Sequence, residues 1–196
     1  ADQQTYTLMV KQQTDPTTDQ AEKVALHIPF NIELYDADGG VIPLRCNGEI
    51  IDQVLNITAF EHSFVFENVA SKPIPSLLRE FSAPVKLDYH YTDEELIFLM
   101  VNARNEFARW DAGQELLAKY IRKNVANVQQ GGEVSLPDAV VAAFKTALLS
   151  QGLEPAFIAE MLSLPSHNEV SGWFKPVDVD AIGTLRLLEA IRFLGL

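Results

Sequence analysis

The chain has 196 residues, of which 47% are hydrophobic, so it is long enough to bury one large core or two small ones. Its net charge of −12 comes from 27 acidic and 15 basic residues spread along the whole chain, which argues against binding to nucleic acid or to an anionic membrane surface. The single cysteine, Cys46, excludes an intrachain disulfide, and every apolar run is far shorter than the ~20 residues of a membrane span. We therefore expect a soluble, cytoplasmic chain with no nucleic-acid partner and no membrane.

Residues 1–91 show the period-two alternation of apolar side chains that is typical of β-strands. After Tyr35, the run Asp-Ala-Asp-Gly-Gly is typical of a hairpin turn, and further turn residues separate the later runs. About seven short antiparallel strands, and hence a β-sandwich, are predicted at residues 6–10, 28–34, 41–44, 54–57, 64–66, 77–81 and 85–89.

From residue 92 onward the apolar spacing becomes helical. Thr92 with Glu95 forms a capping box, and Asn102 and Asn105 are expected to divide the stretch that follows into two helices. A third helix is expected to be capped by Ser135, a shorter one to run from Pro155 to about 164, and a last one from about 178 to 193. Four to five helices joined by short polar loops predict an all-α helical array over residues 92–196.

Catalytic and metal-binding patterns are missing from the sequence. The four histidines have no second histidine at i+3 or i+4, so no helix presents a two-histidine metal face. A thiolate at Cys46 would need a nearby base, and only a coincidence of folding would bring His62 to it. No nucleophile elbow or phosphate-binding loop is present. We assign no catalytic, metal-binding or substrate-binding residue and expect no cofactor in this chain.

One constellation goes beyond periodicity. The run NARNEFARWDA brings basic, acidic and aromatic side chains together at the start of a predicted helix, and we interpret them as a structural junction cluster: Arg104, Phe107, Arg109, Trp110 and Asp111. Glu106 and Arg109 can pair on one helix face, and an arginine can stack on Trp110. The plainer interpretation is a structural ion-pair and aromatic cluster, and the functional one is a latch that fixes the angle between sandwich and helices.

Five segments, in order, resemble the bacterial aminopeptidase N family of zinc metallopeptidases: LHIPFNIELYDADGGVIPL, FVFENV, SLLREFSAPVKLDY, FLMVNARNEFARWDAGQELLAKYI and VSLPDAV. The resemblance covers nearly the whole chain, most clearly residues 4–170, and FARWDAGQ is its most specific piece. It implies an Ig-like β-sandwich domain over residues 1–91 and the N-terminal part of a C-terminal helical domain over residues 92–196.

In that family, the catalytic domain carries H-E-x-x-H, a downstream glutamate and G-x-M-E-N, none of which occurs here. The resemblance therefore implies a non-catalytic fragment that links a catalytic domain to a helical cap. Zinc is expected only in the full-length parent enzyme, which removes N-terminal residues from peptides. The implied partners are the catalytic domain and the remaining helices of the parent chain, with peptides as the parent's substrate.

Two alternatives remain open from the residues themselves. The chain could be a free-standing β-sandwich protein-binding module with a helical appendage, or an independent small enzyme, which would need turnover by the chain alone. A stripe of apolar residues at helical spacing near the C-terminus also predicts self-association of the truncated chain: Ile182, Leu185, Leu188, Ile191 and Leu194.

Overall fold

The computed structural model describes residues 4–174 and residue 183. Contacts divide the chain into two compact units, Ala1–Tyr89 and His90–Leu196. The helix expected at about 178–193, with its apolar stripe, lies outside the described residues except for Gly183. The first unit is rich in strands: β1 Thr5–Lys11, β2 Ile28–Tyr35, β3 Val41–Ile42, β4 Arg45–Cys46, β5 Glu49–Ile50, β6 Val54–Ile57, β7 Glu61–Glu67 and β8 Ile74–Leu77.

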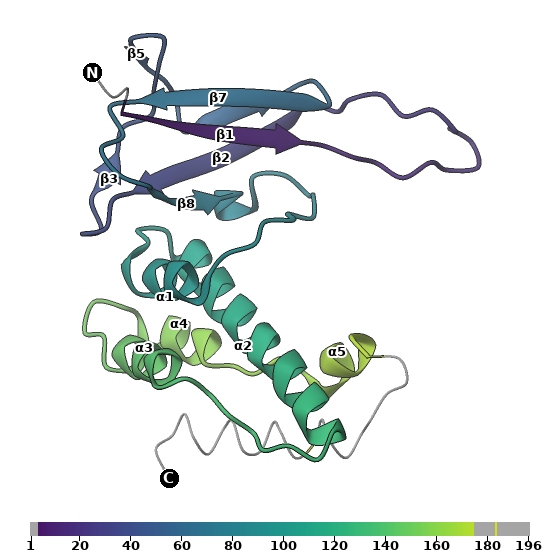
Figure 1. Ribbon diagram of the computed structural model, residues 1–196, viewed down its shortest axis with the longest axis vertical. Coiled ribbons are helices and arrows are strands. Elements are labelled where there is room, and N and C mark those ends of the chain that lie inside the picture. Colours follow the sequence, from purple (N-terminus) through teal and green to yellow (C-terminus); the bar gives the residue numbers. More distant parts are fainter. Residues whose placement is uncertain (1–3, 175–182, 184–196) are drawn as a thin grey trace. The chain divides into compact units, whose positions relative to one another are not determined.

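Strand β2 organises the larger sheet (Figure 1). Its first half pairs antiparallel with β6, from Ile28 opposite Ile57 to Asn31 opposite Val54. Its second half pairs with β8 on residues 32–35 and with β3 on residues 34–35. Strands β1 and β7 form a second, separate antiparallel pair, and β4 and β5 form a short hairpin.

Buried side chains of these strands form the core of the first unit. Ile32, Leu34 and Tyr35 of β2 are fully buried, as is Phe66 of β7. Buried and exposed residues alternate along β6, as the sequence pattern predicts for a strand with one face in the core. Residues 32–35 of β2, in contrast, are all buried, Glu33 among them. The prediction of a β-sandwich of antiparallel strands followed by an array of four to five helices is confirmed.

Two of the predicted strands are wrong. The run 77–81 contains only the end of β8, because the chain turns into the 3-10 helix Arg79–Phe81. Leu78, Glu80 and Phe81 there have positive φ angles of 53°, 55° and 50°, a conformation that cannot continue a strand. The run 85–89 has no strand pairing either, so apolar alternation there reflects a loop.

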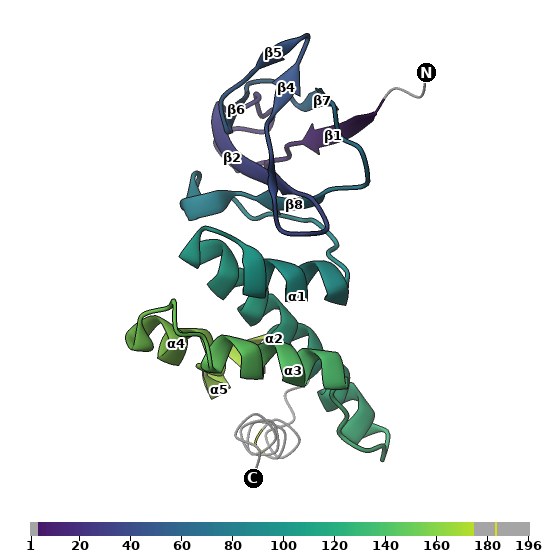
Figure 2. The same cartoon turned by 90° about the vertical axis from the view of Figure 1, so that its left-hand side faces the viewer.

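The second unit contains five helices within the described residues (Figure 2): α1 Asp93–Asn102, α2 Glu106–Gln129, α3 Asp138–Leu148, α4 Pro155–Met161 and α5 His167–Gly172. Helix α1 packs on both α2 and α3, and α4 packs on α2. The capping box of Thr92 and Glu95 and the break between Asn102 and Asn105 are confirmed. No helix among the described residues is both long and apolar enough to cross a membrane.

Two helix termini differ from expectation. Ser135 does not cap α3, because the helix begins only at Asp138 and Pro137 is its N-cap. The backbone of Ser135 is bound by Asn124 instead. The sequence also predicted no separate helix at 167–172, although Ser166 and Glu169 form a complete capping box at its start.

Candidate functional site

The corner between α1 and α2 holds the residues that the sequence singled out. Asn105 accepts a hydrogen bond from the backbone N–H of Ala108 at 2.9 Å, which caps α2. Nε of Arg109, one turn later, donates to the carbonyl oxygen of Met100 at 3.0 Å. Because the last four carbonyls of a helix lack intrahelical partners, Arg109 satisfies one of these groups at the end of α1.

The aromatic members of the cluster lie beside this contact. The rings of Phe107 and Trp110 pack at a centroid separation of 5.7 Å with a tilt of 39°, and both residues are half-buried. Desolvation lowers the pKa of Arg109, and the carboxylate of Glu106 partly offsets this effect. Arg104 precedes the helix and is exposed. Asp111 also reaches solvent, but the protein around its carboxyl raises its pKa through desolvation.

A second contact, which the sequence analysis missed, fastens the other end of α1. Asp93 accepts hydrogen bonds from Lys119, at 2.5 Å, and from the hydroxyl of Tyr120, both on α2. Desolvation opposes ionisation of Asp93, but these hydrogen bonds and the nearby lysine charges outweigh it, so its pKa is lowered. Burial and the bond to Asp93 raise the pKa of Tyr120 to about 12. Helix α1 is thus held to α2 at both ends.

Close packing joins α1 to the middle of α2 between these two contacts. A Cβ atom at Gly113 would lie 3.3 Å from Sδ of Met100 and 3.8 Å from the ring of Phe144 on α3. An alanine here would therefore require Met100 to move by a few tenths of an ångström, whereas its distance to Phe144 would be an ordinary contact. Three helices meet at this point.

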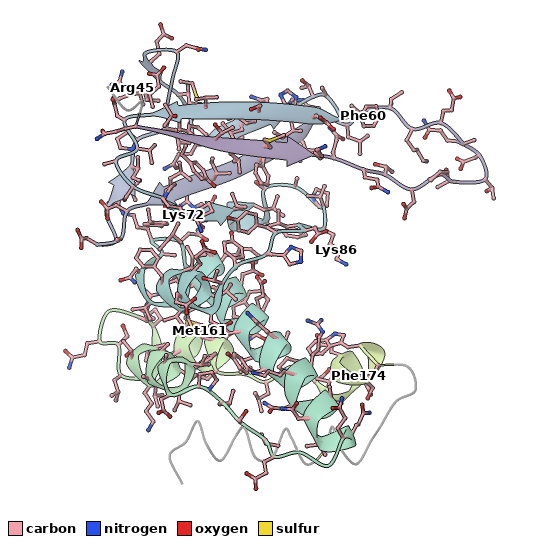
Figure 3. All side chains as sticks on the ribbon, viewed as in Figure 1. Arg45, Phe60, Lys72, Lys86, Met161 and Phe174 are labelled. Carbon is pink, nitrogen blue, oxygen red and sulfur yellow. The ribbon has the colours of Figure 1, made fainter. Side chains whose placement is uncertain are left out.

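A buried amide ties the far end of α2 to the loop before α3. Asn124 is fully buried, its Nδ2 donates to the carbonyl of Ser135 at 3.0 Å, and its Oδ1 accepts from the N–H of Ser135 at 2.9 Å. The signal that could have revealed it is a polar residue inside the apolar stripe of α2, next to Val125. Gln114 similarly donates to the carbonyls of Met161 and Ser163, which anchors the end of α4. Met161 is labelled in Figure 3.

His27 and His62, which carry side chains able to do chemistry, make structural hydrogen bonds. Nε2 of His62 accepts hydrogen bonds from the N–H groups of Thr58 and Ala59, each at 3.0 Å, and the ring of His27 bonds to Asn56 at 2.7 Å. Burial, followed by the charge of Glu67, raises the pKa of the Cys46 thiol, which disfavours a reactive thiolate. Within residues 4–174 and residue 183, no group of three His, Cys, Asp or Glu side chains could hold a metal ion. The donor set for zinc is therefore absent from the described part of the chain.

Comparison with known families matches both units. A model described as a domain of unknown function (DUF3458) with an Ig-like fold matches residues 1–90, and its companion (DUF3458_C), described as ARM repeats, matches residues 93–190. The second match spans half of the chain.

Similar proteins are named aminopeptidases. Aminopeptidase N of Escherichia coli (strain K12) is 54% identical over 92% of this chain and 21% of its own length. Aminopeptidase N of Haemophilus influenzae is 43% identical over 93% of this chain and 21% of its own length. The crystal structure of Legionella pneumophila aminopeptidase A in complex with aspartic acid matches with a TM-score of 0.74 at 29% identity, covering 95% of this chain and 20% of that one. The chain spans about a fifth of the length of the curated relatives that it matches.

Proposed function

Because the chain belongs to the aminopeptidase N family, we propose that it is the non-catalytic scaffold of a zinc aminopeptidase, linking the catalytic domain to a helical cap. One observation carries this proposal: 92% of the chain aligns at 54% identity with 21% of an aminopeptidase N. The zinc of the parent enzyme would then be held by a part of the protein outside this chain, in keeping with the lack, among the described residues, of a group of three His, Cys, Asp or Glu side chains that could hold a metal ion.

The contacts within the helical unit suit a scaffold. Arg109 and Asp93 fasten opposite ends of α1 to α2, and Gly113 lets α1, α2 and α3 approach closely. A unit with such fixed contacts is rigid, and a rigid unit can hold a helical cap at a fixed position. The junction cluster of Arg104, Phe107, Arg109, Trp110 and Asp111 would serve this support as a latch.

The parent activity that we propose is the removal of N-terminal residues from peptides, and its partners are the catalytic domain and the remaining helices of the same polypeptide. We further propose a cytoplasmic location, which the single free cysteine favours. The DNA upstream of the segment that encodes this chain should encode H-E-x-x-H in the same reading frame.

Metal analysis after dialysis and an aminoacyl-amide assay, applied both to the 196-residue chain and to the longer protein, test this function. We expect zinc and turnover in the longer protein and neither in the chain. Zinc near one equivalent held by histidines of this chain, or turnover by the chain itself, would contradict the proposal. A reading frame confined to these 196 residues would favour a free-standing module.

A further inference from the structure

The hairpin of β4 and β5 turns on Asn47–Gly48, the one Asn–Gly pair in the sequence. Both residues have positive φ angles, 52° at Asn47 and 81° at Gly48, as the two central residues of a type I′ hairpin turn require. The hairpin ladder pairs Arg45 with Ile50 and Cys46 with Glu49, so it is short. Figure 2 labels its two strands.

An Asn–Gly pair is able to modify itself. The backbone nitrogen of the glycine attacks Cγ of the asparagine and forms a new N–Cγ bond. The side-chain nitrogen leaves as ammonia and carries away the proton of the glycine N–H. Water then opens the resulting succinimide ring at one of its two carbonyl groups and leaves aspartate or isoaspartate. Every other asparagine of the chain is followed by a residue with a side chain, which hinders the attack.

The surroundings of the pair leave room for this reaction. Asn47 and Gly48 are both exposed, so water reaches them. A Cβ atom built on Gly48 would have no heavy atom of the described residues within 4 Å. Steric shielding therefore does not limit the reaction at Asn47, and the conformation of the turn does.

The observed conformation of Asn47 is unreactive. A left-handed residue has ψ of roughly +47°, which turns the next backbone nitrogen away from its own side chain. The attack on Cγ of Asn47 thus requires rotation about the Cα–C bond of this residue. That rotation swings the whole peptide plane that carries the N–H of Gly48.

Glu67 holds this peptide plane in place. Its Oε2 accepts the N–H of Gly48 at 3.0 Å from β7, which lies against β4. Nη1 of Arg45 donates to the carbonyl oxygen of Gly48 at 2.5 Å, but that oxygen belongs to the following peptide plane. The bond to Glu67 is therefore the side-chain contact that must break before the nitrogen can turn toward Cγ of Asn47.

We propose that Asn47 is a site of spontaneous deamidation, and that Glu67 slows the reaction by holding the N–H of Gly48. Isoaspartate, one of the two products, carries the main chain through the former side-chain methylene and so lengthens the backbone of a two-residue turn. It also adds a negative charge beside the residue that Glu67 binds, and like charges repel. The modified hairpin does not recover the original contact. This inference does not depend on the proposed function.

Timed incubation of the longer protein near neutral pH tests the proposal. Mass spectrometry of the peptide that contains Asn47, together with enzymatic methylation of isoaspartate, gives the rate of deamidation. A synthetic peptide of residues 44–51, in which Glu67 is missing, is the reference. Because the reaction must wait for the turn to open, we expect the folded protein to react about tenfold more slowly than the peptide. Equal rates would overturn the proposal.

Variants of the longer protein isolate the role of Glu67. Glu67→Ala removes the charged acceptor and should raise the rate roughly tenfold, and Glu67→Gln, which keeps an uncharged acceptor, should raise it roughly threefold. The matched control is Glu61→Ala, because Glu61 is a carboxylate of the same strand that pairs with Lys11. It should leave the rate unchanged.

The possible results separate three explanations. Slower deamidation in both Glu67 variants would show that Glu67 acts as a base that removes the proton of Gly48, and it would overturn the proposal. An equal rise in Glu61→Ala would assign the effect to loosening of β7 and would overturn it too. Circular dichroism checks that each variant folds. If Glu67→Ala does not fold, Glu67→Gln and the ratio of the protein rate to the peptide rate still decide.

Discussion

Nε of Arg109 lies 3.0 Å from the carbonyl oxygen of Met100, so a side chain in the first turn of α2 completes the hydrogen bonding of the last turn of α1. Replacing Arg109 by lysine keeps the charge but removes the planar Nε–H donor that makes this bond. We expect Arg109→Lys to lower the free energy of unfolding of the helical unit by about 1–2 kcal/mol. Chemical denaturation measures this, with Lys145→Ala on the exposed side of α3 as the control; equal stability of the two variants would contradict a structural bond.

Asn124 is a fully buried amide that makes two hydrogen bonds, so its substitution should be costly. Asn124→Asp replaces the amide donor by a carboxylate facing the carbonyl of Ser135, in a fully buried site. We expect a loss of about 2–4 kcal/mol in the free energy of unfolding. Because the buried carboxylate is costly only when ionised, the loss should be larger at neutral than at acidic pH. The same amide-to-acid change at the exposed Gln129 should have little effect at either pH.

Asp93 gives the helical unit an acid-sensitive contact. Its pKa is lowered in the folded chain, so its stabilising contribution is present above the ordinary value of 3.8 and is lost as the pH falls through the folded pKa. Asp93→Asn should reduce stability modestly at neutral pH, by about 1 kcal/mol or less, and should flatten the acid limb of a thermal-unfolding profile. Glu94→Gln, an exposed neighbour in the same first turn, should keep that limb. An unchanged acid limb in Asp93→Asn would show that Asp93 does not make this contribution.

Glu80 has a backbone conformation that favours glycine. Its φ of 55° and ψ of 23° are left-handed, and a side chain in that region costs roughly 1–2 kcal/mol. Glu80→Gly should therefore raise the melting temperature or leave it unchanged, after the entropy cost of glycine of about 0.5–1 kcal/mol. The matched change Glu49→Gly, in the exposed strand β5, should lower it. Destabilisation by both changes would show that side-chain contacts of Glu80 outweigh its backbone strain.

The sequence pattern correctly predicted those contacts whose two residues lie within one helical turn of each other. Thr92 and Glu95 form the predicted capping box because each needs only the other's backbone. Ser135 was wrongly taken as a cap because α3 begins later, at Asp138, and Asn124, eleven residues away, holds the Ser135 backbone in the loop before it. The segment Leu78–Phe81 was wrongly taken as a strand because its left-handed angles leave no mark in the apolar pattern.

In the candidate site, too, contacts within one helix could be predicted from the sequence and contacts between helices could not. The sequence brought Phe107, Arg109 and Trp110 together through their spacing on one helix, and it missed the carbonyl of Met100 because a backbone acceptor has no sequence signature. Asp93 is 26 residues from Lys119 and 27 from Tyr120 along the chain. Their contact therefore depends on how α1 folds back on α2, which the local sequence pattern does not show. The role of the junction cluster as a latch between the two units stays a prediction.

Both tryptophans of the chain, Trp110 on α2 and Trp173 after α5, belong to the helical unit. Trp173 lies under the guanidinium of Arg122, 4.4 Å from the ring centroid, and Trp110 packs on Phe107. Intrinsic tryptophan emission therefore reports unfolding of the helices without any contribution from the sandwich. An experimenter can follow the helical half of this chain by an optical signal of its own, without cutting or labelling the chain.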